Sequence, residues 1–279
     1  TIGNLTHAYN QAAKGNGFLQ EFVADEATRA MIEKYGDVCD DLHTDLHECL
    51  GHGSGQLLAG VSADALGSYG STIEEARADL FGLYYIADAK LVELGLVPDA
   101  EAYKSQYYTY MMNGLLTQLT RIQPGNEIEE AHMRNRALIA RWTLKHYPSA
   151  VRLVKYDEKT YVEVSDYELL REAFAKLLAE IQRIKSEGDF EAAKLLVEHY
   201  AIYVEPKLQS GRTSVALPKL HEELLARYKS LGIAPYKGFL NPKMEIVSDS
   251  KGNATDVRLD YTEAYDEQML RYSSEYGFL

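Results

Sequence analysis

The sequence contains no long uncharged apolar run. A membrane-spanning helix needs about 18 or more consecutive apolar residues, and no segment of this chain provides them. The first ten residues, TIGNLTHAYN, have neither the basic region nor the apolar region of a signal peptide. The sequence therefore predicts a chain that neither spans nor enters a membrane.

Cysteine is scarce, with only Cys39 and Cys49 among 279 residues. Two cysteines do not make a disulfide framework for a chain of this size, and their spacing matches no thiolate zinc site. We expect a reducing, cytoplasmic compartment, in which both residues serve as small packing residues. Cys49 lies inside a motif described below and could be sensitive to oxidation. Neither is a candidate nucleophile.

Positive charge is also in short supply. Lys and Arg number 29 against 42 Asp and Glu, which gives a formal net charge of −13, and no basic cluster interrupts it. Such a surface repels phosphate backbones, so nucleic acid is excluded as a partner. With 46% apolar residues, the chain can bury one large domain, or one domain and part of another. It begins at Thr1 rather than Met, which suggests a piece of a longer polypeptide.

Helical patterns dominate the chain, and the predicted fold class is mainly α. Residues 18–36, 73–95 and 167–188 carry apolar side chains at three-and-four spacing and end at a glycine. A further helix is predicted over 191–203, with Asp189 as its N-cap and Glu205-Pro206 as its stop. Alternating residues over 156–164 predict one short strand.

The C-terminal part has a different character. Two segments, MEIV and ATDVRLDY, flank the turn-rich SDSKGN, which predicts a β-hairpin after Pro235 and Pro242. An isolated hairpin is marginally stable, so we expect it to pair with strands that this sequence lacks. We divide the chain into a helical part, 1–241, and a hairpin with a terminal helix, 242–279.

The strongest motif is DLHTDLHECLGHGSG, in which His47 and Glu48 are followed by His52. In the zincin pattern H-E-x-x-H, two histidines four residues apart bind one Zn²⁺ and the adjacent Glu faces the metal-bound water. Here the histidines are five apart, which turns them about 140° from each other on a regular helix. We therefore predict a π-type bulge or an early unwinding, with Gly51 tolerating the unusual backbone.

A third zinc ligand is needed, and STIEEARADL supplies it. Glu75 is the expected ligand of one Zn²⁺ per chain, while Asp79, one helical turn later, can reach a histidine ring nitrogen. Glu74 could orient the other histidine. His43, one turn before His47, is expected to be a surface or supporting residue rather than a fourth ligand.

Other interpretations of these residues are less favourable. A lone histidine usually serves packing, and EEARAD alone is an ordinary helix start with acidic residues suited to the helix dipole. GHGSGQ does not follow a strand and has no Walker lysine, which argues against a nucleotide loop. A structural zinc usually has four protein ligands, whereas this motif offers three ligands and a base. The combination predicts a catalytic metal.

Four segments resemble the dipeptidyl peptidase III family in the same order along the chain: TIGNLTHAY, HECLGHGSG, STIEEARADLFGLYY and EEAHMRNRALI. With Cys49, HECLGHGSG is most similar to the bacterial, Bacteroides-type branch. Ala76 and Asp79 depart from the family, which commonly has Cys and Glu there. The shorter Asp79 must approach its histidine more closely, or through water.

The resemblance implies a zinc-dependent peptidase that releases dipeptides from the N-terminus of oligopeptides. It implies Glu48 as the general base and His132 as the residue that steadies the substrate carbonyl. Arg136 lies one helical turn after His132, so in a helical segment it faces the same cleft and could bind a peptide carbonyl or carboxylate of the substrate. The resemblance also implies a two-lobed protein, in which residues 1–241 are the helical zinc-binding lobe and residues 242–279 belong to a β-barrel lobe that is otherwise absent from this sequence. The N-terminal lobe of the same protein is the implied partner, and it carries most of the groups that bind the substrate amine. The alternative is a fragment that binds zinc and peptide without turnover.

Overall fold

The computed structural model describes residues 15–204, 218–232 and 243–260, together with five positions between 267 and 274. The chain divides into two compact units, Thr1–Leu231 and Gly232–Leu279. Helices make up most of the first unit, and the second contains a two-stranded hairpin. The predicted mainly α class is confirmed.

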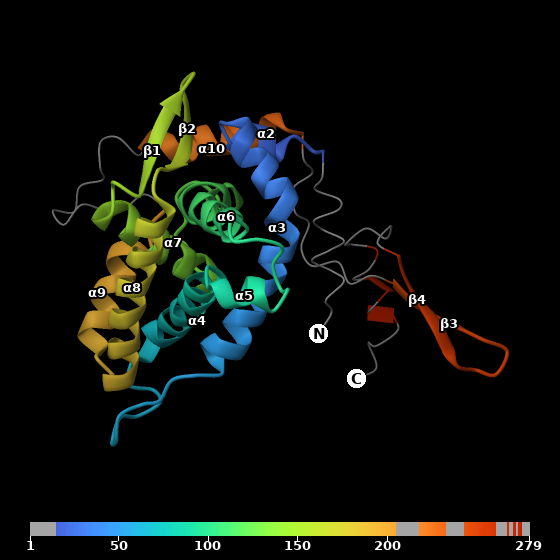
Figure 1. The fold of residues 1–279 in the computed structure, drawn as a ribbon, viewed down its shortest axis with the longest axis horizontal. Coiled ribbons are helices and arrows are strands. Elements are labelled where there is room, and N and C mark those ends of the chain that lie inside the picture. Colours follow the sequence, from blue (N-terminus) through green and yellow to red (C-terminus); the bar gives the residue numbers. More distant parts are fainter. Residues whose placement is uncertain are drawn as a thin grey trace. The chain divides into compact units, whose positions relative to one another are not determined.

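The helices and strands of the first unit are labelled in Figure 1. In order they are α2 (Phe18–Phe22), α3 (Glu26–Leu46), the π-helix η1 (His47–His52), the 3₁₀ turn η2 (Gly67–Tyr69), α4 (Gly70–Ile86), α5 (Ala89–Glu93), α6 (Tyr103–Leu115), the 3₁₀ turn η3 (Thr117–Arg121), α7 (Ala131–His146), β1 (Val151–Tyr156), β2 (Lys159–Val164), α8 (Tyr167–Glu187), α9 (Phe190–Tyr200) and α10 (Pro218–Ser230).

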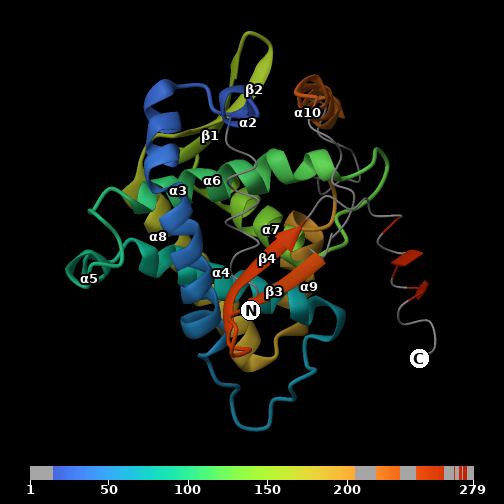
Figure 2. The ribbon, with the colours of Figure 1, turned by 90° about the vertical axis from the view of Figure 1, so that its right-hand side faces the viewer.

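Helix α4 lies at the centre of this unit. Helices α3, α7 and α8 and the π-helix η1 all pack against it, and Figure 2 shows α4 between α3 and α7. Ile73, Leu80 and Leu83 of α4 are completely buried, as expected for a helix covered on several sides. Because α4 is covered on several sides, its charged residues Arg77 and Asp79 are also buried. Charged residues at the centre of a fold need fixed partners.

The helix predictions are confirmed over α8 and α9. Gly188 ends α8 in the left-handed region with φ of 66°, and the Asp189 side chain accepts a hydrogen bond from Ala192 N at the start of α9. Elsewhere the predicted boundaries are wrong. Asp25 caps α3 and separates it from α2, and α3 continues through Gly36 without a break. Asp88 likewise divides the helix predicted over 73–95 into α4 and α5.

The single strand predicted over 156–164 is half of an antiparallel hairpin. β1 ends at Tyr156 and β2 begins at Lys159, which pair across a two-residue turn. Asp157 and Glu158 form this turn with φ of 47° and 63°. Positive φ at both positions is typical of a type I′ turn, which usually contains Asn-Gly or Asp-Gly. Because Asp-Glu lacks that signal, the sequence pattern missed β1.

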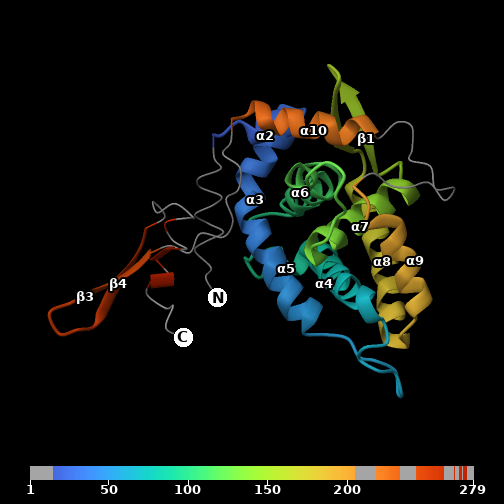
Figure 3. The same cartoon turned by 180° about the vertical axis from the view of Figure 1, so that it is seen from behind.

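Helix α10 closes the end of the first unit, where Figure 3 shows it beside α2 and β1. Arg227 of α10 is buried and lies over the rings of Phe22 and Tyr161, at 4.5 and 4.8 Å from their centroids. It also donates to the Glu21 carboxylate at 2.8 Å and to Thr160 O at 2.6 Å. One side chain thus joins α2, β2 and α10.

In the second unit, β3 (Lys243–Ser248) and β4 (Ala254–Asp260) pair antiparallel, with an irregularity at Val247/Ser248. The predicted C-terminal hairpin is confirmed. Glu267, Leu270, Arg271, Ser273 and Ser274 are helical. The predicted boundary at residue 241 and the stop at Glu205-Pro206 lie outside the described residues, as do Pro235 and Pro242. Among the described helices, none is both long and apolar enough to cross a membrane.

Candidate metal centre

Helix α3 continues directly into the π-helix η1, which consists of HECLGH. The amide of Gly53 donates to Glu48 O at 3.0 Å, five residues back, as a π turn requires. The widened turn corrects the five-residue spacing of the two histidines, whose ring centroids lie 4.6 Å apart. The distortion predicted from the spacing is confirmed.

Gly51 is needed for a different reason from the one predicted. It does not occupy the left-handed region, so the backbone conformation itself does not require glycine. A Cβ at this position would lie 2.6 Å from Ala78 Cα and 2.7 Å from Ala78 Cβ. Glycine therefore lets η1 approach α4 closely enough for the histidines to reach the carboxylates there.

His47, His52 and Glu75 offer ligand atoms that lie within 4.8 Å of one another. Glu75 Oε2 is 3.3 Å from His47 Nε2 and 3.5 Å from His52 Nε2. This oxygen is buried and has no hydrogen-bond partner among the described residues. Burying a carboxylate oxygen without a hydrogen-bond donor costs free energy. A site that binds a cation would contain such an oxygen, because the cation takes the place of the donor.

The other ring nitrogen of each histidine has its own carboxylate. Asp79 Oδ1 lies 2.7 Å from His47 Nδ1, and Glu74 Oε1 lies 2.9 Å from His52 Nδ1. Asp79, despite its short side chain, makes this contact directly. These contacts place a proton on each Nδ1 and leave each Nε2 free to bind a metal. Two neutral imidazoles and one carboxylate form a donor set that suits zinc.

Asp79 is buried by three helices. Burial raises the pKa of its carboxyl, but hydrogen bonds from His43 and His47 hold that pKa far below its usual range. His43 Nε2 lies 3.2 Å from Asp79 Oδ1, and the Tyr110 hydroxyl donates to Asp79 Oδ2 at 2.7 Å. His43 is therefore a buried supporting residue, one of the two expected roles. Tyr110 gave no sequence signal, because it lies 31 residues from Asp79 on another helix.

Arg77 is the main functional candidate that sequence reasoning missed. Its side chain is fully buried and donates twice to the Glu74 carboxylate and once to Gly51 O, at 2.7 Å. Lys185 also contacts Glu74. Burial raises the pKa of Glu74, and Arg77, Lys185 and His52 together lower it to about 2. The three-residue spacing of Glu74 and Arg77 on a helix was a signal for this pair.

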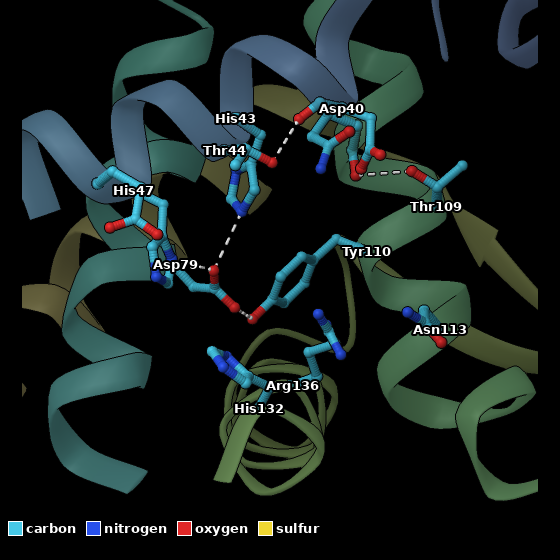
Figure 4. A pocket seen from close by; sticks show the side chains of 12 residues that line it. Asp40, His43, Thr44, His47, Asp79, Thr109, Tyr110, Asn113, His132 and Arg136 are labelled. Atoms are coloured by element: carbon cyan, nitrogen blue, oxygen red, sulfur yellow. Dashed lines mark hydrogen bonds and ion pairs between the residues drawn. The ribbon is translucent and has the colours of Figure 1, made fainter. Parts of the chain in front are cut away.

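A cavity of about 290 Å³ lies beside the group formed by His47, His52 and Glu75, between α3, α6 and α7. His47, Glu48, His132 and Arg136 all line it, and Figure 4 shows His132 and Arg136 pointing into it from α7. His132 Nδ1 lies 3.2 Å from Glu75 Oε2, although the side chain is 51% exposed. Glu48 is exposed, and no described residue hydrogen-bonds to its carboxylate. All predicted site residues except Glu74 therefore line this cavity or contact Glu75 beside it, and Glu74 contacts the group through His52.

The family model for peptidase family M49 matches residues 60–227, which is more than half of the chain. The chain belongs to peptidase family M49. The matched range contains Glu74, Glu75 and His132, whereas the π-helix with His47 and His52 precedes it. The family resemblance drawn from the sequence is confirmed.

Among solved structures, the dipeptidyl peptidase III of Caldithrix abyssi is similar at 24% identity with a TM-score of 0.57. The match covers 79% of this chain and 37% of that one. The dipeptidyl peptidase III of Corallococcus sp. strain EGB matches at 24% identity and a TM-score of 0.46, over 70% of this chain and 31% of that one. The chain shares its fold with part of the first structure and spans about a third of the length of both.

Proposed function

We propose that this chain is the zinc-binding catalytic part of an exopeptidase that releases dipeptides from the N-terminus of oligopeptides. One observation carries the proposal. In the described part of the chain, the buried Glu75 Oε2 accepts no hydrogen bond, although His132 Nδ1 lies 3.2 Å away. It is faced by Nε2 of His47 and of His52, and each of these rings is oriented by its own carboxylate. Membership of a peptidase family supports the same conclusion.

His47, His52 and Glu75 would hold one Zn²⁺. Bound zinc would supply Lewis acidity, polarising the scissile carbonyl and lowering the pKa of water. Three protein ligands leave a position open for water or substrate, as catalytic zinc sites do and structural sites do not. The direct contact between Asp79 and His47 supports this assignment, because carboxylates that orient ligand histidines also raise their basicity.

Glu48 is the proposed general base. It takes a proton from the attacking water and returns it to the leaving amine, and its carboxylate is exposed at the cavity with no competing partner in the described chain. His132 donates a hydrogen bond to the substrate carbonyl oxygen as negative charge develops there. Arg136 binds a peptide carbonyl or carboxylate through its planar guanidinium. Both side chains point into the cavity that would receive the substrate.

The substrate amine would be bound mainly by an N-terminal lobe of the same protein, and we propose a cytoplasmic location. Because the chain spans about a third of the similar structures, a second candidate is a fragment that binds zinc and peptide without turnover. Assay of this chain with dipeptidyl naphthylamides separates the two. Turnover supports the peptidase, and stoichiometric zinc without turnover supports the fragment.

Metal content tests the proposal directly. Protein purified without added metal and then supplied with zinc should hold about one zinc per chain by mass spectrometry. Glu75→Ala should lose it, while Glu48→Ala should retain it, because Glu48 is not among the proposed ligands. A wild-type chain that binds no zinc, or a Glu75→Ala chain that binds as well as wild type, would overturn the assignment.

A further inference from the structure

Asp79 receives three polar contacts from two other helices. Its Oδ1 lies 2.7 Å from His47 Nδ1 and 3.2 Å from His43 Nε2, both at the end of α3 or its continuation. Its Oδ2 accepts from the Tyr110 hydroxyl of α6 at 2.7 Å. The carboxylate is only 8% exposed, so these donors replace water around it. Its orientation is therefore set by His43 and Tyr110 as much as by His47.

Asn135 of α7 extends the network by one step. Tyr110 Oη lies 3.2 Å from Asn135 Oδ1, while the buried Asn135 Nδ2 has no hydrogen-bond partner among the residues that the structure describes. The hydroxyl has one hydrogen, which the shorter contact to Asp79 uses. Exchange of the Asn135 amide oxygen and nitrogen lets Nδ2 donate to Tyr110 Oη. The hydrogen bonds then run in one direction, from Asn135 through Tyr110 to Asp79.

His43 is held in place by the shape of α4. A Cβ on Gly82 would lie 2.7 Å from His43 Nδ1 and 3.1 Å from His43 O, so the imidazole packs directly on the glycine. His43 Nδ1 is buried and makes no hydrogen bond within the described ranges, which leaves Nε2 as the nitrogen that donates to Asp79. Gly82 thus packs against the His43 ring, and Asp79, one turn away on α4, accepts the hydrogen bond from its Nε2.

We infer that His43, Tyr110 and Asn135 are positioning residues for the metal ligand His47, and that they act through Asp79. The inference rests on the proposed metal site and extends it. Fixing Asp79 fixes the His47 ring with Nδ1 protonated and Nε2 directed at Glu75. Three helices, α3, α6 and α7, would then set the direction of one ligand on η1.

A matched pair of tyrosines on α6 tests this. Tyr110→Phe removes the hydroxyl that donates to Asp79, and Tyr107→Phe removes one that donates to Leu83 O at 2.8 Å. Both side chains are buried. Zinc affinity is measured by competition with a chromophoric chelator, and the thermal midpoint is measured on metal-free protein. We expect both variants to lower the midpoint, and only Tyr110→Phe to weaken zinc binding, by about 10-fold or more.

A second pair of variants covers the case in which Tyr110→Phe does not fold. His43→Gln keeps a donor near the position of Nε2, and His43→Leu removes it. Rescue of zinc affinity by Gln and loss with Leu is the expected result. In an Asp79→Asn background, Tyr110→Phe should have no further effect on zinc affinity, because the network acts through the carboxylate.

The outcomes are distinguishable. If the wild-type chain binds no zinc, the proposed function and this inference both fail. If the wild-type chain binds one zinc and Tyr110→Phe and His43→Leu bind it equally well, only the inference fails. Two zinc ions per chain would also overturn it, since His43, His47 and Asp79 lie close enough to hold an ion themselves and His43 would then be a ligand.

Discussion

Arg77 and Glu74, one turn apart on α4, share two hydrogen bonds, from Arg77 Nε to Glu74 Oε2 at 3.0 Å and from Nη2 to Oε1 at 2.8 Å. Glu74 in turn contacts His52. Replacing the buried Arg77 by Met should lower the free energy of unfolding by about 1–3 kcal/mol, because Glu74 and Gly51 O each lose a charged hydrogen-bond donor, although Lys185 and His52 still contact Glu74. Urea denaturation of the metal-free protein measures this.

Arg183 is the control for that prediction. It also pairs with carboxylates, from Glu180, Glu187 and Asp189, but at the surface of α8. Water compensates for the loss of such pairs, so Arg183→Met should change stability little. Equal effects of the two substitutions would show that the interior position of Arg77 has no energetic importance.

Gly51→Ala should destabilise the protein and weaken zinc binding. The added methyl would lie 2.6 Å from Ala78 Cα, so η1 must move away from α4. Overpacking of this kind costs about 1–3 kcal/mol. Gly36→Ala is the matched control within α3, where the nearest atom is 3.6 Å from the new Cβ. Its effect should be neutral or stabilising, by up to about 1 kcal/mol. Thermal unfolding and chelator competition distinguish the two glycines.

The two cysteines should differ in reactivity. Burial raises the pKa of the Cys39 thiol to about 12, and its Sγ donates to Ala102 O at 3.3 Å. Since only the thiolate is nucleophilic, Cys39 should not react with a disulfide reagent at about pH 8, whereas the exposed Cys49 should. We expect one equivalent of thiol to titrate in the native protein and two after unfolding. Cys49→Ser should abolish the native signal, and its persistence would contradict the assignment.

Glu21 should contribute to stability in a pH-dependent way. Burial raises the pKa of its carboxyl, but hydrogen bonds from Lys159 and Arg227 lower that pKa by more than burial raises it. The net pKa therefore lies below the ordinary 4.5. The unfolded chain therefore binds this proton first as the pH falls. The stabilisation is complete above about pH 4.5 and is lost as the pH drops through the lower, folded-state value.

Glu21→Gln tests this pH dependence. Urea unfolding across about pH 6 to about pH 3 should give a flatter curve of stability against pH for the variant than for wild type. Parallel curves would mean that the contacts of Glu21 with Lys159 and Arg227 do not persist in solution.

Glu48→Ala should separate chemistry from metal binding. General acid–base catalysis contributes about 10²- to 10⁴-fold, so kcat on a dipeptidyl naphthylamide should fall by at least about 100-fold while zinc affinity stays unchanged. Cys49→Ala, at the adjacent exposed position, is the control and should keep both. Substantial turnover by Glu48→Ala would remove this residue from the proposed mechanism.

Local sequence signals determined much of the fold. Asp189 caps α9 and Gly188 ends α8 as predicted, because caps depend on a few neighbouring backbone groups. The π turn was also predictable, since five-residue histidine spacing cannot place both rings together on a regular helix. Strand β1 was missed because its turn, Asp157-Glu158, has positive φ without the residues that usually signal it.

The candidate metal-binding residues and their carboxylate partners were within reach of the sequence, because His47, His52, Glu74, Glu75 and Asp79 occupy two short segments with interpretable spacing. What surrounds them was not. Gly51 is explained by contact with Ala78, and Asp79 is oriented by Tyr110 on another helix. The sequence by itself determined helices α8 and α9, the distorted turn and the candidate ligands with their carboxylate partners Glu74 and Asp79, because these depend on neighbours along the chain. Tertiary structure alone decided that His43 and Tyr110 orient Asp79 and that Gly51 packs on Ala78, because these contacts depend on the packing of α3 and α6 around α4.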